Sequence, residues 1–410
     1  MNKSVRHLPI KDLLIEIIDN RGKSVPTVEN GFPLIATNCI KHSSIYPTFD
    51  KVRYVDEETM KNWFRAHLKP NDILFVNKGT PGRVCLVPDP VTFCAAQDMM
   101  GFRCNDKLIS YKYLFAALRS HEIQKIIENN HVGLVIPHFR KQDLSSLLIP
   151  VKSRIEQDFI GDLYILLSEK IELNNRINAD LEAMAKTLYD YWFVQFDFPD
   201  KNGKPYKTSG GKMVWNEEMN REIPKDWDSG ELKDIANITM GQSPPGESYN
   251  EEGNGMIFYQ GCTDFGNRFP TIRKFTTEPT RFAKVGDILL SVRAPVGTLN
   301  IAKEDCCIGR GLASLNSKDN CIGYLFGVMV NLKQIFDRRN VNGTTFGSIT
   351  KDDLFSLKVV MPTINILEKY HIVINSSFEK QNQLELENIK LTELRDWLLP
   401  MLMNGQVKVN

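Results

Sequence analysis

Two long stretches with helical character constrain the fold of this chain most strongly. The first, residues 155–193, has no proline and no glycine after Gly161, and the second runs from about residue 367 to residue 403. In the first, apolar residues recur at alternating spacings of three and four, the a/d pattern of a coiled coil. At 1.5 Å per residue this helix would be roughly 55 Å long, so its apolar seam needs a partner of similar length. We therefore predict two long helices that pack against each other.

The two stretches are copies of each other. The last part of the second can be laid on the first without a gap, which places the run from Leu391 to Met401 over the run from Leu181 to Tyr191. A repeated helix implies that the segment before it is repeated as well. The residues predicted to pack between the helices are Leu181, Met184, Leu188, Leu391, Leu394 and Leu398.

The segments before the two helices also match. Residues 69–84 align with residues 284–299, and residues 131–147 align with residues 341–357, in the same order. The matched pairs are Asp72 and Asp287, Lys78 and Arg293, Gly82 and Gly297, Gly133 and Gly343, Lys141 and Lys351, Asp143 and Asp353, and Leu144 and Leu354. The chain therefore reads as globule, helix, globule, helix.

The fold class predicted is α+β, with two repeated α/β domains separated by two antiparallel helices that form a coiled-coil spacer. Short β-like runs, turns and one helical run alternate in each globule. A polar connector follows the first helix, and its Trp215 and Trp227 should lie against the protein because exposed tryptophan is unusual. The predicted parts are a first domain 1–154, a first helix 155–195, a connector 196–228, a second domain 229–365, and a second helix with its tail 366–410.

Composition and charge favour a cytoplasmic protein that binds a polyanion. Hydrophobic residues make up 42% of the chain, enough for packed cores, and no apolar run approaches a membrane span. The net charge is +1, yet residues 1–154 hold 22 Lys and Arg against 15 Asp and Glu, whereas residues 155–200 hold 3 against 10. A basic globule suits nucleic acid, and an acidic helix is better suited to a protein partner or to solvent. The eight cysteines include no C-x-x-C and should be buried, reduced thiols.

Motifs for catalysis are absent from the sequence. The run Gly210-Gly211-Lys212 lacks the upstream glycine of a phosphate-binding loop, and the histidines show no metal-ligand spacing. The segment Ser243-Pro244-Pro245-Gly246 approaches the amino-methyltransferase motif, but the aromatic residue that stacks on a flipped base is missing. We therefore expect a non-catalytic chain with no cofactor or metal of its own.

Candidate DNA-binding residues lie on turns at corresponding places of the two globules. Arginine pairs well with guanine, and glutamine with adenine, in the major groove. Flanking glycines and prolines would hold such side chains on stiff loops. The candidates are Lys78, Thr80, Arg83 and Gln97 in the first domain and Arg293, Arg310, Thr344 and Thr345 in the second, with the loop Gly241-Gln242-Ser243 as a further possibility.

With these residues in view, the chain resembles the specificity subunit of type I restriction-modification systems. The resemblance covers essentially the whole chain and is carried by YDYWFVQFDFPDKNGKPYKTSGGKMVWNEEMNREIPKDW after the first helix, MGQSPPGESYNEEGNG in the second domain and LRDWLLPMLMNGQV near the C-terminus. It implies two target-recognition domains, each reading one half of a split sequence on double-stranded DNA. It also implies partners: two modification subunits and two restriction subunits, which would carry S-adenosylmethionine, ATP and magnesium.

Two alternatives come from other classes of protein. One is a scaffold that uses its coiled coil to join proteins and does not bind DNA; salt-dependent retention on duplex DNA in the presence of a modification partner separates it from the first interpretation. The other is a self-contained methyltransferase-nuclease. The chain lacks methyl-donor motifs, which argues against this second alternative. Binding of S-adenosylmethionine by the isolated chain would support the alternative.

Overall fold

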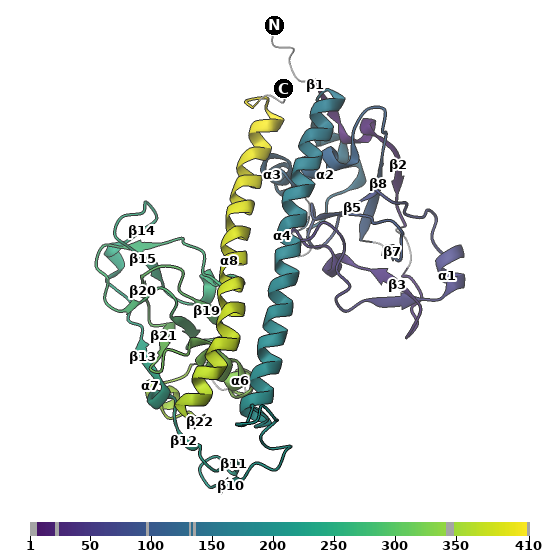
Figure 1. The fold of residues 1–410 in the computed structure, drawn as a ribbon. Coiled ribbons are helices and arrows are strands. Elements are labelled where there is room, and N and C mark those ends of the chain that lie inside the picture. The colour runs from purple at the N-terminus through teal and green to yellow at the C-terminus, as the bar shows by residue number, and fades with distance from the viewer. Residues whose placement is uncertain are drawn as a thin grey trace. The chain divides into compact units, whose positions relative to one another are not determined.

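The computed structural model of the 410-residue chain describes residues 6–20, 24–95, 98–130, 133, 137–341 and 348–407. Its residues group into two compact units, of which the first comprises Met1–Asn175 with Glu387–Asn410 and the second Arg176–Leu386. Each unit contains one α+β domain and one end of each of two long helices, α4 (Arg154–Tyr189) and α8 (Ile364–Met403) (Figure 1). The two repeated domains and the two long helices predicted from the sequence are thus present.

The domain of the first unit is built on two small sheets. The larger has the strand order β2-β8-β5-β6 and is antiparallel, and the smaller has the order β4-β3-β7, with β3 parallel to β7. The short strands β1 and β9 pair separately. The elements are β1 Arg6–Pro9, β2 Leu14–Ile18, β3 Phe32–Ile35, β4 Arg53–Val55, α1 Glu57–Asn62, β5 Ile73–Val76, β6 Val84–Leu86, β7 Cys94–Ala95, β8 Met99–Cys104, α2 Tyr111–Arg119, α3 His121–Asn130 and β9 Leu148–Val151.

The domain of the second unit repeats this plan. Its four-stranded sheet has the order β13-β21-β18-β19, its second sheet the order β14-β16-β15-β20-β17, and β12 pairs with β22. A separate hairpin, β10 and β11, lies in the connector. The elements are β10 Met213–Asn216, β11 Arg221–Pro224, β12 Asp228–Glu231, α5 Leu232–Ile235, β13 Ala236–Met240, β14 Tyr249–Asn250, β15 Met256–Tyr259, β16 Phe275–Thr276, β17 Phe282–Ala283, β18 Ile288–Ser291, β19 Leu299–Ile301, β20 Cys306–Ile308, β21 Leu312–Ser317, α6 Ile322–Val341, α7 Lys351–Phe355 and β22 Lys358–Met361.

Strand register shows that the two domains are copies. Ile73 of β5 lies opposite Phe102 of β8, and Ile288 of β18 lies opposite Leu315 of β21. The parallel pair β3 and β7 has its counterpart in β15 and β20. One difference is that the helical run expected over residues 112–129 breaks at Ser120 into α2 and α3, whereas α6 is a single helix.

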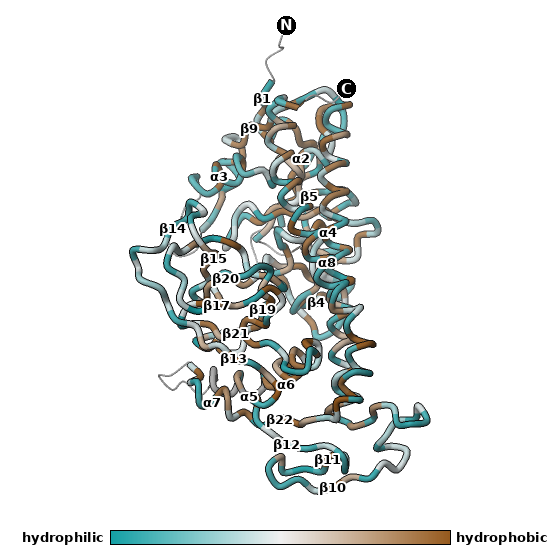
Figure 2. The backbone as a smooth tube through the Cα atoms, turned by 60° about the vertical axis from the view of Figure 1, so that its left-hand side comes forward, coloured by the Kyte–Doolittle hydropathy of each residue, from teal (hydrophilic) through white to brown (hydrophobic). Residues whose placement is uncertain are grey.

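The position of strand β5 between two hydrophobic cores explains why its sequence is continuously apolar. Its four residues are all fully buried, and they alternate between two cores. Ile73 and Phe75 belong to the core beneath α2 and α4, and Leu74 and Val76 belong to the core around β3 and β7. Successive side chains of a strand point to opposite faces, so a strand covered on both faces needs apolar residues at every position. Figure 2 shows apolar colour gathered where the strands of the second domain meet around β19, and mostly hydrophilic colour along the connector near β11.

Each unit packs its helix ends into the domain core. In the first unit, Leu399 and Leu402 of α8 join the core that contains Ile160 and Tyr164 of α4. The start of α4 therefore lies beside the end of α8, so the helices are antiparallel there. In the second unit, α4 ends in a π-helical turn, Asp190–Val194, whose Trp192 ring lies 5.4 Å from that of Tyr370 in α8.

The predicted packing residues need correction. Met184 is 64% exposed and Leu394 is 43% exposed, and Leu181, Leu188, Leu391 and Leu398 are only half-buried. Two physical reasons explain the error. Each helix contacts both its partner helix and a domain, so its buried face is wider than an a/d seam and is shifted by about one residue. The layer between the helices is also partly polar, because Asn174, Gln381 and Asn388 are buried there, and a search for apolar residues does not find it.

Of the two connector tryptophans predicted to lie against the protein, one does so. Trp227 is buried and stacks on Phe198, with ring centroids 4.7 Å apart and planes 18° from parallel. Trp215, in β10, is 61% exposed, so the expectation that it lies against the protein is wrong for this residue. The reason is local: β10 and β11 form a two-stranded hairpin with no third strand to cover that face.

The cysteines are free thiols, as expected. Six of the eight are buried, and the other two, Cys104 and Cys262, are half-buried. Burial raises the pKa of the Cys94 thiol to about 12 and that of Cys321 to about 11, because the thiolate is poorly solvated there. These thiols therefore stay protonated and pack as small apolar side chains.

Candidate nucleic-acid interface

The turns that carry Lys78 and Arg293 share one main-chain hydrogen bond and one glycine conformation, although the Ala294–Pro295 peptide bond of the second turn is cis and the first turn has no cis bond. The N–H of Gly82 donates to the carbonyl of Val76 (3.0 Å), and the N–H of Gly297 donates to that of Ser291 (2.9 Å). Both glycines have a positive φ, 93° and 89°, which residues with a side chain rarely adopt. Each turn therefore follows the corresponding strand of its sheet and is closed by the same main-chain bond, and side chains add further bonds, such as Gln124 Nε2 to the carbonyl of Gly82 and Ser291 Oγ to the carbonyl of Arg293.

Lys78 and Arg293 occupy equivalent positions on these turns. Lys78 forms an isolated β-bridge with His138, and Arg293 forms one with Ser348. Both side chains are exposed beyond the end of the sheet. The pairing of these two cations that the sequence repeat predicted is thus also a spatial equivalence.

In the second unit, Arg293 and Arg310 line one hollow of about 280 Å³. Arg310 lies on the turn between β20 and β21. Arg273, Lys274 and Gln260 line the same hollow, so four cationic side chains and one amide converge there. A concave surface with several cations attracts a phosphate backbone, and arginine and glutamine can also bind base edges.

Two glycines bring Arg310 to the edge of the hollow. A Cβ on Gly311 would lie 2.7 Å from the carbonyl oxygen of Gln260, and one on Gly309 would lie 2.9 Å from the Cα of Gln260. The strands can therefore approach closely only because these positions lack side chains. The backbone N–H of Arg310 lies 3.4 Å from the hydroxyl oxygen of Ser243, so the loop 241–243, which was a further candidate, packs against this turn.

One of the four cations has an acidic partner. Asp264 is buried and accepts a hydrogen bond from Arg273 Nε (2.7 Å), which holds Arg273 at the rim. In the part of the chain that the structure describes, Lys274, Arg293 and Arg310 form no ion pair. Because an exposed, unpaired cation is available to a phosphate or a base, the hollow carries net positive charge toward solvent.

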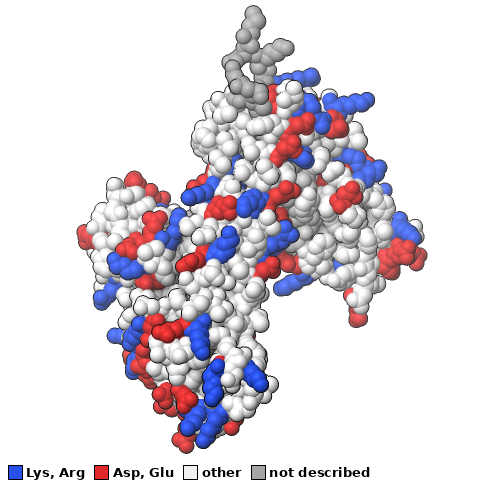
Figure 3. Space-filling view, in the orientation of Figure 1, with Lys and Arg blue, Asp and Glu red and all other residues white. Residues whose placement is uncertain are grey.

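Local charge distinguishes the hollow better than any broad surface pattern. On the face drawn in Figure 3, Lys and Arg are interspersed with Asp and Glu. In the hollow, by contrast, four cationic side chains converge with one carboxylate, so its local charge is positive.

The remaining sequence candidates are placed differently. Thr80 lies on the same turn as Lys78 and is half-buried. Arg83 follows that turn. The pKa of His42 is lowered mainly by burial and then by the positive charges of Arg119 and Arg83, so Arg83 lies near the loop that carries His42. Gln97, Thr344 and Thr345 lie outside the described residues.

The sequence argument missed Gln260, Arg273 and Lys274. A usable signal existed for Gln260, because β15 pairs in parallel with β20 as β3 pairs with β7, and Gln260 directly follows β15. Extending the repeat back to β3 and β15 would have placed Gln260 beside Arg310. Arg273 and Lys274 precede β16, which extends the second sheet, and no repeat comparison marks them.

Comparison with known proteins places this architecture in one family. The model of the family described as type I restriction modification DNA specificity domain matches twice, over residues 18–183 and 224–394. The chain therefore belongs to the family of type I restriction-modification specificity subunits, the non-catalytic component of those systems. In the described residues, no helix is long and apolar enough to cross a membrane.

Two relatives and one solved structure illustrate the similarity. A putative type I restriction enzyme MjaX specificity subunit of Methanocaldococcus jannaschii is 30% identical over 418 aligned residues, covering 98% of this chain and 93% of the relative. The HindI specificity subunit of Haemophilus influenzae is 22% identical, covering 83% of this chain and 87% of the relative. The crystal structure of a type I S subunit from M. genitalium has a TM-score of 0.62 at 20% identity, covering 98% and 97% of the two chains, which supports the fold.

Proposed function

We propose that this chain recognises a bipartite sequence on double-stranded DNA, one half with each domain, and directs modification and restriction subunits to that target. The observation that carries the proposal is the equivalence of the turns at Lys78 and Arg293, one in each copy of the domain. Two copies of one reading surface imply two half-sites. Different side chains at the equivalent positions imply that the two half-sites differ in sequence.

Within each domain, the roles of the cations follow from their chemistry. Arg310 is the candidate base reader, since its guanidinium can make two parallel hydrogen bonds to guanine and Gly309 and Gly311 let the turn approach a groove. Lys78 is the candidate phosphate contact, because its ammonium acts as a point charge. Gln260 joins Arg310 as a second group able to bind a base edge.

An exposed apolar stripe on α4 supports docking of protein partners. Ile155, Phe159, Leu166 and Leu173 in the first unit are all exposed and are spaced by four, seven and seven residues. At 100° per residue they lie on the side of the helix opposite the buried Tyr164. An apolar stripe left uncovered on a helix is suited to a partner's helix, and the modification subunits are the proposed occupants.

The proposed complex contains two modification subunits and two restriction subunits around one copy of this chain. S-adenosylmethionine, ATP and magnesium would be bound by those subunits. This chain would contribute the choice of DNA sequence and the surfaces that hold the catalytic subunits in place.

Exchange of one domain tests the proposal. Residues 1–150 are replaced by those of another family member with a known target, and genomic methylation is mapped at base resolution in cells that also carry the modification subunit. We expect one half of the recognised sequence to change and the other to stay. The matched control replaces residues 229–365 and should change only the other half. Methylation that changes in both halves, or in neither, contradicts the proposal.

A further inference from the structure

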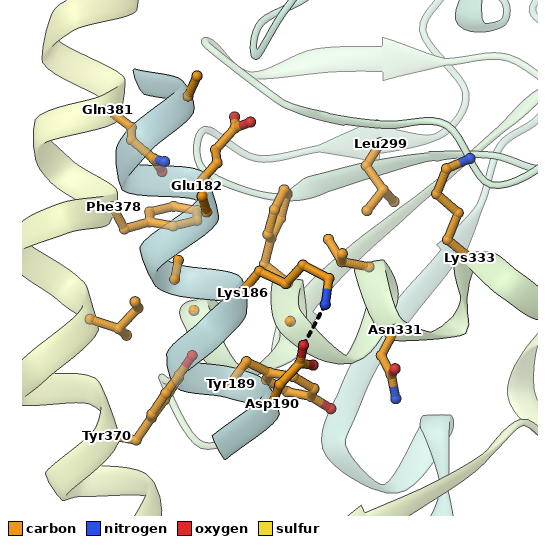
Figure 4. A pocket seen from close by; sticks show the side chains of 18 of the residues that line it. Glu182, Lys186, Tyr189, Asp190, Leu299, Asn331, Lys333, Tyr370, Phe378 and Gln381 are labelled. Carbon is orange, nitrogen blue, oxygen red and sulfur yellow. Dashed lines mark hydrogen bonds and ion pairs between the residues drawn. The ribbon is translucent and has the colours of Figure 1, made fainter. Parts of the chain in front are cut away.

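The second unit contains an apolar groove that the DNA-binding surface does not use. It has a volume of about 560 Å³ and lies among α4, α6, α8 and the start of β19. Figure 4 shows the rings of Tyr189, Tyr370 and Phe378 around it, with Leu299 on the opposite wall. A pocket of this size lined mainly by apolar and aromatic side chains is of the kind that binds ligands or partner side chains.

Three of the four charged side chains that line the groove form ion pairs. Lys186 and Asp190, one turn apart on α4, form an ion pair that Figure 4 draws as a dashed line. Lys333 of α6 pairs with Asp337 at 3.0 Å. The fourth, Glu182, forms no ion pair among the described residues, and burial raises the pKa of its carboxyl group, which favours the neutral form beside an apolar occupant.

The internal repeat shows what fills this place in the first unit. The hydroxyl of Tyr113 in α2 donates to the carbonyl of Pro150 in β9, and that of Tyr324 in α6 donates to the carbonyl of Val360 in β22, which aligns α2 with α6. On this alignment Val330 of the groove corresponds to Arg119. The turn and helix alignments make Thr298 correspond to Arg83, and Ala185 to Arg395. Three lining positions of the groove thus hold arginine in the other copy.

In the first unit two of these arginines, Arg119 and Arg395, stack on aromatic rings. The guanidinium of Arg119 lies 4.4 Å from the ring centroid of Phe115, the counterpart of Phe326 in the groove. Arg395 lies 5.4 Å from the ring centroid of Tyr164, and the Phe115 and Tyr164 rings are 6.1 Å apart. The space that is open in the second unit is therefore occupied by the chain's own side chains in the first.

The carbonyl group that accepts from Arg119 in the first unit has a counterpart in the second unit that accepts from a different side chain. Arg119 Nη2 donates to the carbonyl of Val84 at 3.0 Å. At the corresponding place in the second unit, Asn300 Nδ2 donates to the carbonyl of Leu299 at 2.9 Å and to that of Gly266 at 3.0 Å. Asn300 thus already satisfies these acceptors. The guanidinium of Arg268 lies 4.3 Å from the ring centroid of Phe378 and 6.0 Å from that of Phe326, so these rings already have a cation, and the space that remains open favours an apolar side chain.

From these observations we propose that the groove receives one or two large apolar side chains of a modification subunit, a partner whose presence rests on the function proposed above. Continuity with the exposed apolar face of α4 supports this occupant, because Met184 and Tyr191 are exposed on the same turns of the helix that contribute Ala183 and Asp190 to the groove. At the equivalent place of the first unit, Arg119 and Arg395 fill the space. Two copies of one modification subunit consequently meet different surfaces, and the copy at the second unit gains contacts that the other lacks.

A tryptophan placed in the groove tests the proposal. Ala183 is exposed on α4 and lines the groove, so Ala183→Trp fills the space without burying a new group in the core. Its matched control is Glu393→Trp, at the repeat-equivalent exposed position of α8 in the first unit. The full-length chain is titrated with the modification subunit and the complexes are counted by native mass spectrometry. We expect the wild type and Glu393→Trp to bind two copies, and Ala183→Trp to lose affinity for one copy by about tenfold or more.

Two further measurements keep the outcomes distinct. Thermal unfolding of Ala183→Trp at the wild-type temperature excludes a folding defect. A photo-crosslinking residue, p-benzoylphenylalanine, at Lys333 on the rim should attach to an apolar segment of the modification subunit. A crosslink to DNA or to another copy of this chain, or equal binding by Ala183→Trp and the wild type, overturns the groove proposal. Failure of the wild-type complex to methylate a defined sequence would instead overturn the proposed function.

Discussion

Asn174 of α4 donates a hydrogen bond from Nδ2 to Oδ1 of Asn388 in α8, at 3.0 Å and out of contact with solvent. Asn388 Nδ2 in turn donates to Asn175 Oδ1 at 2.9 Å. A buried asparagine between two helices bonds well only in one alignment, because sliding either helix separates the amides. This polar layer therefore fixes the helix register in the first unit.

The first prediction concerns this layer. Asn388→Leu removes one of the two acceptors of Asn174 Nδ2, which keeps its hydrogen bond to Glu387 Oε2 at 2.9 Å, and removes the donor to the half-buried Asn175. It should lower the free energy of unfolding by about 1 kcal/mol. Asn174→Leu with Asn388→Leu removes both sides of the main bond and should cost less than the sum of the two single changes. Urea unfolding of the four proteins in a double-mutant cycle measures the coupling. Strict additivity would show that the amides do not interact in solution.

A second prediction separates the buried from the exposed face of α8. Leu384 is buried in the second unit, so Leu384→Asp places an unpaired carboxylate in an apolar site and should cost several kcal/mol. Leu394 is exposed, and Leu394→Asp should leave the unfolding midpoint almost unchanged while weakening binding of the modification subunit. Denaturant unfolding and a pull-down with the modification subunit distinguish the two effects. Equal destabilisation by both substitutions would instead support the packing residues predicted from the sequence.

The third prediction uses two glycines with the same backbone conformation. Gly286 and Gly297 have φ values of 86° and 89°, but a Cβ on Gly286 meets nothing within 4 Å, whereas one on Gly297 would lie 2.6 Å from the Cβ of Phe336. Gly286→Ala should cost about 1–2 kcal/mol from the left-handed backbone alone. Gly297→Ala should cost roughly 1–3 kcal/mol more from the steric clash. If thermal unfolding shows the same loss for both, the packing of Phe336 against this turn is not as described.

A fourth prediction assigns roles to the turn cations. In the intact complex, Arg310→Ala should reduce affinity for the cognate sequence by about 1–3 kcal/mol and relax the preference at one base position. Lys78→Ala should weaken binding to all sequences and lower the dependence of log K on log salt by about one unit. The control is Arg281→Ala, an exposed cation of the second domain that does not line the hollow. Fluorescence anisotropy over a salt series measures all three, and behaviour of Arg310→Ala like that of the control would place base reading elsewhere.

Most of the fold could be predicted from the internal repeat and from the helical periodicity of the sequence. Matching Asp72 to Asp287 and Gly82 to Gly297 was enough to predict two equivalent domains, because both pairs serve the same turn geometry: each aspartate accepts from the backbone N–H three residues before it, at 2.7 and 2.9 Å. Such local main-chain requirements restrict which residue types can occupy a position, so they can be recognised in the sequence. The same comparison predicted that Lys78 and Arg293 would be equivalent.

Packing between helices and the composition of the hollow were not predictable in the same way. The position of Met184 on an exposed face depends on how α4 divides its surface between α8 and a domain, which no local pattern encodes. Arg273 and Lys274 reach the hollow from a strand that is distant in sequence from Arg310. Long-range juxtaposition of this kind depends on the complete topology, so the sequence shows the residue types but not their meeting point.

The turn between β18 and β19 has a consequence for how new members of this family arise. Its shape is held by a main-chain hydrogen bond between Gly297 and Ser291, and the side chain of Arg293 takes no part in that bond. A different residue at position 293 therefore leaves the scaffold intact. Under selection, such a position can vary through many side chains at little cost in stability. If the function proposed above holds, a lineage could acquire a new target sequence one substitution at a time.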